Sequence, residues 1–258
     1  MFDYLTEPMP TSSEIKRMFV LTKEKLDQYK RVAVEVSGGS DSDILIDLIE
    51  KLRGPANVIY YVYYNTGLDF DATKIHLKEL EQKYNICIMR ETPRKPIPIS
   101  AKENGQPFLS KKVSEYMERL QAHKFKWEDL PLNVLMNRYP NCQSALKWWC
   151  NKWGNSSSFN IEKQKYLKEF IIQNPPTFKI STKCCSYNWD NTQRQFCKNM
   201  GIELVCNGLR KEETDIRFFS EKTCFSKKDG LAAQFRPLYY LSDADKQIYK
   251  DLFNLTYS

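Results

Sequence analysis

The most constraining feature of the sequence is the segment from Arg31 to Leu52, RVAVEVSGGSDSDILIDLIEKL. Its first residues are apolar and mostly β-branched, which predicts a buried strand, and its second half has apolar residues at helical spacing. Between them lies a turn, Ser37–Ser42, with two adjacent glycines. A strand, a glycine turn and a helix N-terminus are typical of an anion site, because the backbone can approach an oxyanion closely and helix N–H groups point at it. The alternative interpretation is a serine- and glycine-rich surface turn. The glycine spacing matches neither the dinucleotide fingerprint nor the Walker loop.

The segments around this turn alternate between strand and helix patterns. An amphipathic helix is expected up to about residue 29, with a capping box at Thr11–Glu14. Residues 57–64 and 85–90 read as strands, and residues 71–84 between them as a helix. The first of these strands ends in the polar turn Asn65–Asp69. This alternation predicts an α/β fold with a doubly wound, mostly parallel sheet, which binds ligands at the carboxyl ends of its strands.

The chain of 258 residues is predicted to form a single domain, residues 1–258, with a helical insertion at residues 100–180. The insertion shows no obvious strand and is rich in aromatic residues. After it we expect a helix capped by Asp190 and ending at Gly201, a strand at 202–207, and a terminal helix at 242–255 with Ser242 and Asp245 in a capping box.

Composition limits the classes of partner. The net charge of +7 suits a polyanion such as a nucleotide or nucleic acid, although scattered Lys and Arg fit a plain surface equally well. The aromatic and basic stretch 124–153 suits either nucleic-acid binding or core packing. No apolar run approaches the ~20 residues that span a bilayer, and MFDYLTEPMP is not typical of a signal peptide. We therefore expect a cytoplasmic protein with no membrane partner.

Several motifs carry a family resemblance. SGGSDS resembles the SGGxDS loop of the PP-loop ATP pyrophosphatase superfamily, in which many members have Lys where this chain has Ser40. Further segments resemble the phosphoadenosine phosphosulfate (PAPS) reductase-like family and its phage and prophage branch. They are Asn65-Thr66-Gly67-Leu68, FLSKKVSE at 108–115, FKISTKCC at 178–185, Gly208-x-Arg210-x-x-Glu213-Thr214-x-x-Arg217, and Arg236-Pro237-Leu238. Together they cover roughly residues 30–255, in the family's order.

The resemblance implies a fold like that of the adenine nucleotide alpha hydrolases and an enzyme that binds ATP or a related nucleotide such as PAPS. The expected reaction is cleavage between the α- and β-phosphates, which activates an unidentified acceptor or supports transfer of sulfur to a partner. The residues expected to bind the nucleotide are Ser37, Gly38, Gly39, Ser40, Ser42, Asn65, Thr66, Gly67, Gly208 and Glu213. The expected catalytic residues are Asp41, Arg210 and Arg217.

Two of these roles have alternatives. Asp41 is either a Mg²⁺ ligand beside the phosphates or a helix-capping acceptor that shapes the loop. Arg210 and Arg217 can form bidentate bonds with phosphate or sulfate oxygens, with Glu213 orienting them. The alternative is a surface helix with an ordinary Glu213–Arg217 pair.

The eight cysteines and two histidines suggest thiol chemistry, a metal site or core packing. Cys184-Cys185 resembles the cysteine pair of iron–sulfur members of the family, and this implies a [4Fe–4S] cluster with Cys224 and, as the fourth ligand, Cys150. Packed thiols are the alternative.

Three other functions remain open at this point. PAPS reduction is less expected, because the chain ends FNLTYS without the C-terminal cysteine of thioredoxin-dependent members. The second is a subunit for nucleic-acid modification, similar to the family's DNA phosphorothioation proteins. The third is a nucleotide-binding module without turnover.

Overall fold

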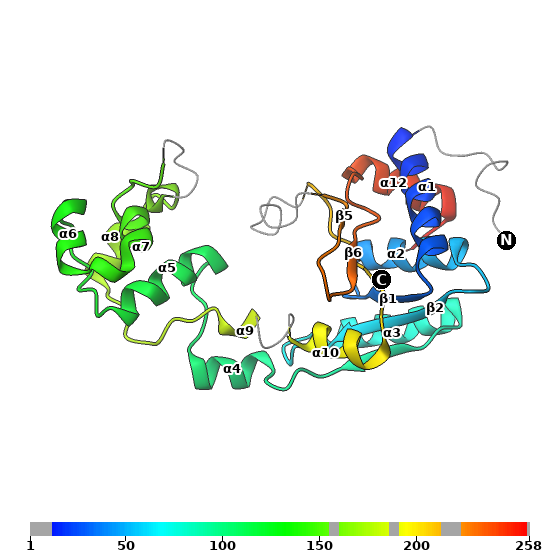
Figure 1. Cartoon of the computed structure of the whole chain (residues 1–258), viewed down its shortest axis with the longest axis horizontal. Coiled ribbons are helices and arrows are strands. Elements are labelled where there is room, and N and C mark those ends of the chain that lie inside the picture. Colours follow the sequence, from blue (N-terminus) through cyan, green and yellow to red (C-terminus); the bar gives the residue numbers. More distant parts are fainter. Residues whose placement is uncertain (1–11, 155–159, 186–190, 213–222, 257–258) are drawn as a thin grey trace. The chain divides into compact units, whose positions relative to one another are not determined.

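A computed structural model of the chain describes residues 12–154, 160–185, 191–212 and 223–256 (Figure 1). Its centre is a six-stranded sheet in the order β3-β2-β1-β4-β6-β5. The strands are β1 (Arg31–Glu35), β2 (Val58–Tyr64), β3 (Ile88–Glu91), β4 (Leu204–Cys206), β5 (Phe225–Ser226) and β6 (Ala233–Phe235). Neighbouring strands are parallel except β5, which is antiparallel to β6. The predicted α/β class with a mostly parallel sheet is therefore confirmed.

Helices surround the sheet and also form a separate group. The helices near the sheet are α1 (Ser13–Gln28), α2 (Ser40–Leu52), α3 (Asp71–Tyr84), α10 (Asn191–Met200) and α12 (Asp243–Phe253). The others are α4 (Ile97–Asn104), α5 (Lys111–Ala122), α6 (Leu132–Arg138), η1 (Pro140–Cys142), α7 (Gln143–Trp149), η3 (Ile161–Lys163), α8 (Leu167–Gln173) and α9 (Lys183–Cys185).

Both faces of the sheet are buried. Successive side chains of a strand point to opposite faces, and in the central strand β1 apolar residues lie on both faces. Val32 and Val34 of β1 belong to a core shared with residues of α1, α2, α3 and α12. Ala33, between them, belongs to a second cluster with Phe196 of α10. Helices α1 and α12 lie side by side (Figure 1), and the Phe19 and Tyr249 rings stack between them at a centroid distance of 6.1 Å.

Several predicted boundaries agree with the structure. Helix α3 spans the predicted residues, and Ser242 with Asp245 forms the predicted capping box of α12. The first helix is capped by Ser12, one residue after the predicted Thr11, since the Ser12 side chain accepts a bond from the amide of Ile15. Asp190 lies outside the described residues.

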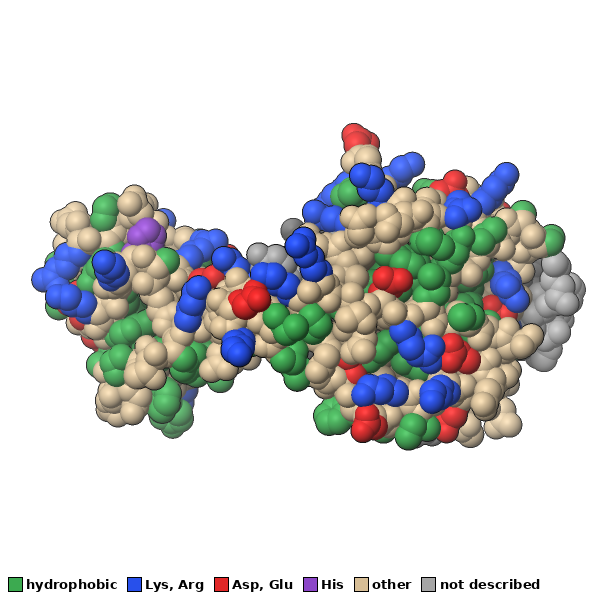
Figure 2. Space-filling model, turned by 90° about the horizontal axis from the view of Figure 1, so that it is seen from below, with side chains coloured by type: hydrophobic (Ala, Val, Ile, Leu, Met, Phe, Trp, Pro, Cys, Tyr) green, Lys and Arg blue, Asp and Glu red, His purple; other side chains and the backbone are tan. Residues whose placement is uncertain are grey.

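The backbone divides into two compact units, Met1–Arg94 with Trp189–Ser258, and Lys95–Asn188. The predicted insertion, residues 100–180, falls inside the second unit, which we call the helical unit. The helical unit has its own core, in which Phe125, Trp127, Trp148 and Trp149 are buried. Core packing therefore accounts for these aromatic residues, for which the sequence also allowed nucleic-acid binding. On the face that Figure 2 shows, Lys and Arg side chains are spread among side chains of other types.

None of the described helices has the length and apolar character needed to cross a membrane.

Candidate nucleotide site

The glycine turn lies at the carboxyl end of β1, where the order of strands reverses. Strands β2 and β3, which follow β1 in the chain, lie on one side of β1 in the sheet. The later strands β4, β6 and β5 lie on its other side. Gly208 and Arg210 follow β4 as the glycine turn follows β1. In open α/β sheets, ligands bind at the carboxyl ends of the strands at such a switch point. The topology thus brings the two motifs to the place where a ligand is expected.

The two glycines of the turn have different structural roles. Gly38 has a φ of +77°, and a Cβ there would lie 2.8 Å from Thr73 Cγ2 on α3. Position 38 therefore requires glycine for the fold itself. Gly39 is the N-cap of α2 with φ −97° and ψ 168°, and among the described residues a Cβ there would meet only Ser37 Oγ, at 3.6 Å. The space in front of Gly39 is open to a ligand.

Two serines of the turn, Ser37 and Ser42, contact each other. The Ser42 hydroxyl accepts a bond from the Ser37 amide and lies 2.9 Å from Ser37 Oγ. These two side chains thus close the loop on itself. The N-cap residue of α2, Gly39, makes no side-chain cap bond. Because the first N–H groups of a helix have no partner within it, they are available to an anion.

Gly208 joins the second motif to the first. A Cβ at Gly208 would lie 3.3 Å from Asp41 Cβ and 3.4 Å from the Asp41 carbonyl carbon. The residue without a side chain therefore lets the segment after β4 pack directly against the start of α2.

Arg210 is 9% exposed and pairs with acidic side chains. Its Nε donates to Asp41 Oδ2 at 3.3 Å, and its NH2 group lies 2.8 Å from Asp243 Oδ1 on α12. Burial opposes the charged form, but Asp41 and Asp243 hold the pKa of the Arg210 guanidinium above its usual value. Arg210 therefore links the loop to the start of α12, in addition to any contact with a ligand.

Lys246 of α12 also reaches the loop. Its Nζ lies 2.5 Å from Asp41 Oδ1 and donates to Ser40 Oγ at 3.1 Å. Sequence reasoning missed this residue, because the capping box locates α12 but no local pattern shows which distant loop it meets. Asp41, predicted as a Mg²⁺ ligand or a cap, lies between Lys246 and Arg210 as their shared carboxylate.

The turn after β2 lies beside this site. Asn65 Oδ1 accepts the amide of Gly67 at 3.0 Å, and the Thr66 hydroxyl donates to Asp69 at 3.3 Å. These bonds hold the turn in shape, and Gly67 adopts a φ of +85°. Since β2 is the parallel neighbour of β1, the predicted residues Asn65, Thr66 and Gly67 lie at the same edge as the glycine turn.

Sequence reasoning also missed a buried pair behind the loop. His76 Nε2 of α3 lies 2.9 Å from Asp43 Oδ1 in the first turn of α2. Burial raises the pKa of Asp43, against the opposing effect of His76. For His76, burial favours the neutral form, but the bond to Asp43 prevails and raises its pKa. This pair fixes α3 against the helix that begins the site.

The remaining predicted residues are Glu213, Arg217 and the four cysteines. Glu213 and Arg217 lie outside the described residues, and so does the side chain of Cys185. Cys184 is buried, Cys224 is half-buried, and Cys150 Sγ donates to the Leu130 carbonyl at 3.8 Å. Burial raises the pKa of Cys150, which favours the thiol over the thiolate that binds metals. In the described part of either unit, no three His, Cys, Asp or Glu side chains are placed to hold a metal ion. The iron–sulfur site stays a prediction.

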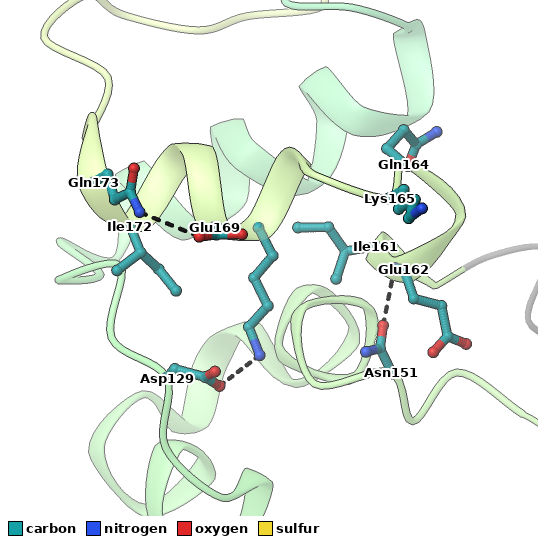
Figure 3. A pocket seen from close by; sticks show the side chains of 10 residues that line it. Asp129, Asn151, Ile161, Glu162, Gln164, Lys165, Glu169, Ile172 and Gln173 are labelled. Carbon is teal, nitrogen blue, oxygen red and sulfur yellow. Dashed lines mark hydrogen bonds and ion pairs between the residues drawn. The ribbon is translucent and has the colours of Figure 1, made fainter.

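One hollow lies within the helical unit (Figure 3). Lys168 pairs with Asp129 at 2.5 Å across it, and Asn151 Oδ1 accepts the amide of Glu162 at 3.1 Å. Its lining contains none of the predicted site residues. The glycine turn therefore remains the candidate site.

The fold and this edge together define an α/β protein with a candidate anion site at the switch point of its sheet. Residues 31–133 match the family model of the phosphoadenosine phosphosulfate reductase domain. Over this range, which contains the glycine turn, the chain is similar to the PAPS reductase domain, in agreement with the resemblance that its motifs indicate. No curated protein matches the sequence.

Two solved structures are similar. Phosphoadenylyl-sulfate (PAPS) reductase from Candida auris, in a phosphate complex, is 11% identical with a TM-score of 0.49, over 93% of this chain and 81% of that one. The U34-tRNA thiolase NcsA from Methanococcus maripaludis, with its [4Fe-4S] cluster, is 12% identical with a TM-score of 0.43. This match covers 93% of the present chain but only 65% of the thiolase, which is less than two thirds of its length.

Proposed function

We propose that this protein binds ATP or a related adenine nucleotide at Ser37–Ser42 and cleaves it between the α- and β-phosphates. The observation that carries the proposal is the contact between Gly208 and Asp41, which joins the two family motifs at the switch point of the sheet. The match of residues 31–133 to the family model supports it. In this reaction a nucleophilic atom of the acceptor forms a bond to the α-phosphorus. The bond from that phosphorus to the bridging oxygen breaks, and pyrophosphate leaves.

The residues of the site have separate roles in this reaction. The N–H groups at the start of α2 bind phosphate oxygens, and the open side of Gly39 lets the phosphates approach the backbone. Asp41 fits a Mg²⁺ ligand, because Mg²⁺ needs only one or two protein carboxylates when phosphates and water supply its other ligands. Bound there, Mg²⁺ would neutralise charge on the pyrophosphate leaving group. Arg210 holds Asp41 in place from the opposite side, through its Nε.

The test is the identity of the products. We expect incubation with ATP and Mg²⁺ to release pyrophosphate and to leave AMP or an AMP adduct, resolved by phosphorus NMR and chromatography. Because the acceptor is unidentified, calorimetric titration with ATP is measured in parallel. ADP and inorganic phosphate as the only products, or no ATP binding, would contradict the proposal.

The family match favours a second candidate, reduction of a sulfonucleotide such as PAPS. It is tested in the same assay with PAPS and a thiol reductant in place of ATP. Release of sulfite with adenosine 3′,5′-bisphosphate, and no pyrophosphate from ATP, would favour reduction over α–β cleavage. Transfer of AMP or sulfur to an acceptor belongs to the first proposal, α–β cleavage, and not to reduction.

A further inference from the structure

Lys246 occupies an unusual position for a cation. It projects from the first turns of α12 to the first turn of α2, where its ammonium contacts both Ser40 Oγ and Asp41 Oδ1. Its side chain is only 16% exposed. The positive end of a helix dipole disfavours a neighbouring ammonium unless an anion is also present. The carboxylate of Asp41 provides that anion in this structure.

A second cation, Arg210, also contacts the Asp41 carboxylate. Arg210 already donates to Asp41 Oδ2, and the structure holds Arg210 from two more directions, through Asp243 and the Leu241 carbonyl. Two cations therefore share Asp41. Arg210 is fixed by several partners, whereas Lys246 extends past Asp41 to Ser40, the residue next to the open glycine. An ammonium has three N–H donors, so it can exchange one acceptor for another while it keeps its place.

We infer that Lys246 is the phosphate-binding cation of this site, exchanging Asp41 Oδ1 for a phosphate oxygen when nucleotide binds. The inference rests on the proposed function and adds to it a residue from the opposite end of the chain. The exchange has a second consequence, because it frees one oxygen of Asp41 for Mg²⁺ while Arg210 retains the other. Through this exchange, binding of phosphate by Lys246 makes the Asp41 carboxylate available as a Mg²⁺ ligand.

The experiment compares ATP affinity by calorimetry in the full-length wild-type protein and four variants. Lys246→Met removes the charge with little change in side-chain length, and Lys246→Arg retains it. Lys250→Met removes an equal charge one turn further along α12 and serves as the control. The double variant Ser40→Lys with Lys246→Met returns a lysine to the same region, since Ser40 Oγ is 3.1 Å from the ammonium.

We expect Lys246→Met to weaken ATP binding at least tenfold, and the Lys250→Met control to stay within threefold of wild type. Lys246→Arg and the double variant should each recover most of the lost affinity. ATP binding within threefold of wild type in Lys246→Met would overturn the inference. So would a loss of affinity that neither restoring variant repairs and that accompanies a fall in melting temperature, because Lys246 would then be a structural residue. Failure of the wild-type protein to bind ATP would instead contradict the proposed function.

Discussion

At the scale of the residue, the two glycines of the loop have different roles, one in the fold and one in the proposed function. Gly38 adopts a left-handed φ of +77° against Thr73, so its lack of a side chain serves the packing of α3. Gly39 has an extended backbone that any residue can adopt, and the space beside it is open. Within the described residues, the structure gives no packing reason for glycine at position 39. Approach of a ligand to the backbone supplies one.

Alanine at each position tests this separation. We expect Gly38→Ala to destabilise the protein by about 1–3 kcal/mol, because of the left-handed backbone and the contact with Thr73. Gly39→Ala should cost less than about 1 kcal/mol, the range of an N-cap change, yet weaken ATP binding at least tenfold. Urea unfolding and calorimetry measure the two effects. Unchanged ATP affinity in a stable Gly39→Ala variant would show that phosphates do not approach this residue.

At the scale of the element, the pair of His76 and Asp43 joins α3 to the start of α2. The pKa of each group is raised in the folded protein, so the folded state binds more protons than the unfolded state. Stability contributed by His76 is therefore complete below its unfolded pKa of about 6.5 and is lost as pH rises through the folded value. The raised pKa of Asp43 acts in the same direction at lower pH, above its unfolded value of about 3.9.

This linkage gives a measurable pH dependence. We expect the free energy of unfolding to fall from pH 6 to pH 8 in the wild-type protein, and by less in His76→Gln. A tenfold change in the protonation constant of His76 corresponds to about 1.4 kcal/mol. NMR of the histidine ring protons provides the direct measurement, and Asp43→Asn should lower the pKa of His76. Only one other histidine, the exposed His123, needs to be distinguished. An unchanged pKa in Asp43→Asn would contradict the assigned pair.

The elements also show what the sequence could predict. Strong periodicity gave β1, β2, α2 and α3 nearly to the residue, because each has an apolar face long enough to read. Strands β5 and β6 were missed, since two and three residues are too short for a period of two to show. The glycine turn was predictable from local chemistry, whereas the ion pair of Lys246 with Asp41 was not. Residues so far apart in the chain meet only through the packing of α12 against α2.

At the scale of the whole molecule, each unit has its own core. The clusters around the sheet and the cluster of the helical unit share no buried residue. Four of the five tryptophans, Trp127, Trp148, Trp149 and Trp153, lie in the helical unit, whereas the glycine turn lies in the other. Tryptophan fluorescence therefore reports mainly on the helical unit, and ATP binding reports on the sheet.

Truncation of one buried side chain in each unit tests whether the two cores act separately. Trp149 is fully buried and its Nε1 donates to the Glu128 carbonyl, so Trp149→Ala should destabilise the helical unit by about 3–5 kcal/mol. We expect a lower midpoint in fluorescence-monitored urea unfolding, with ATP affinity at low temperature within threefold of wild type. Phe19→Ala is the matched variant in the core of the sheet unit, and there ATP affinity should be lost along with stability. Equal loss of ATP binding in both variants, below the unfolding transition, would mean that the nucleotide site depends on the helical core as much as on its own.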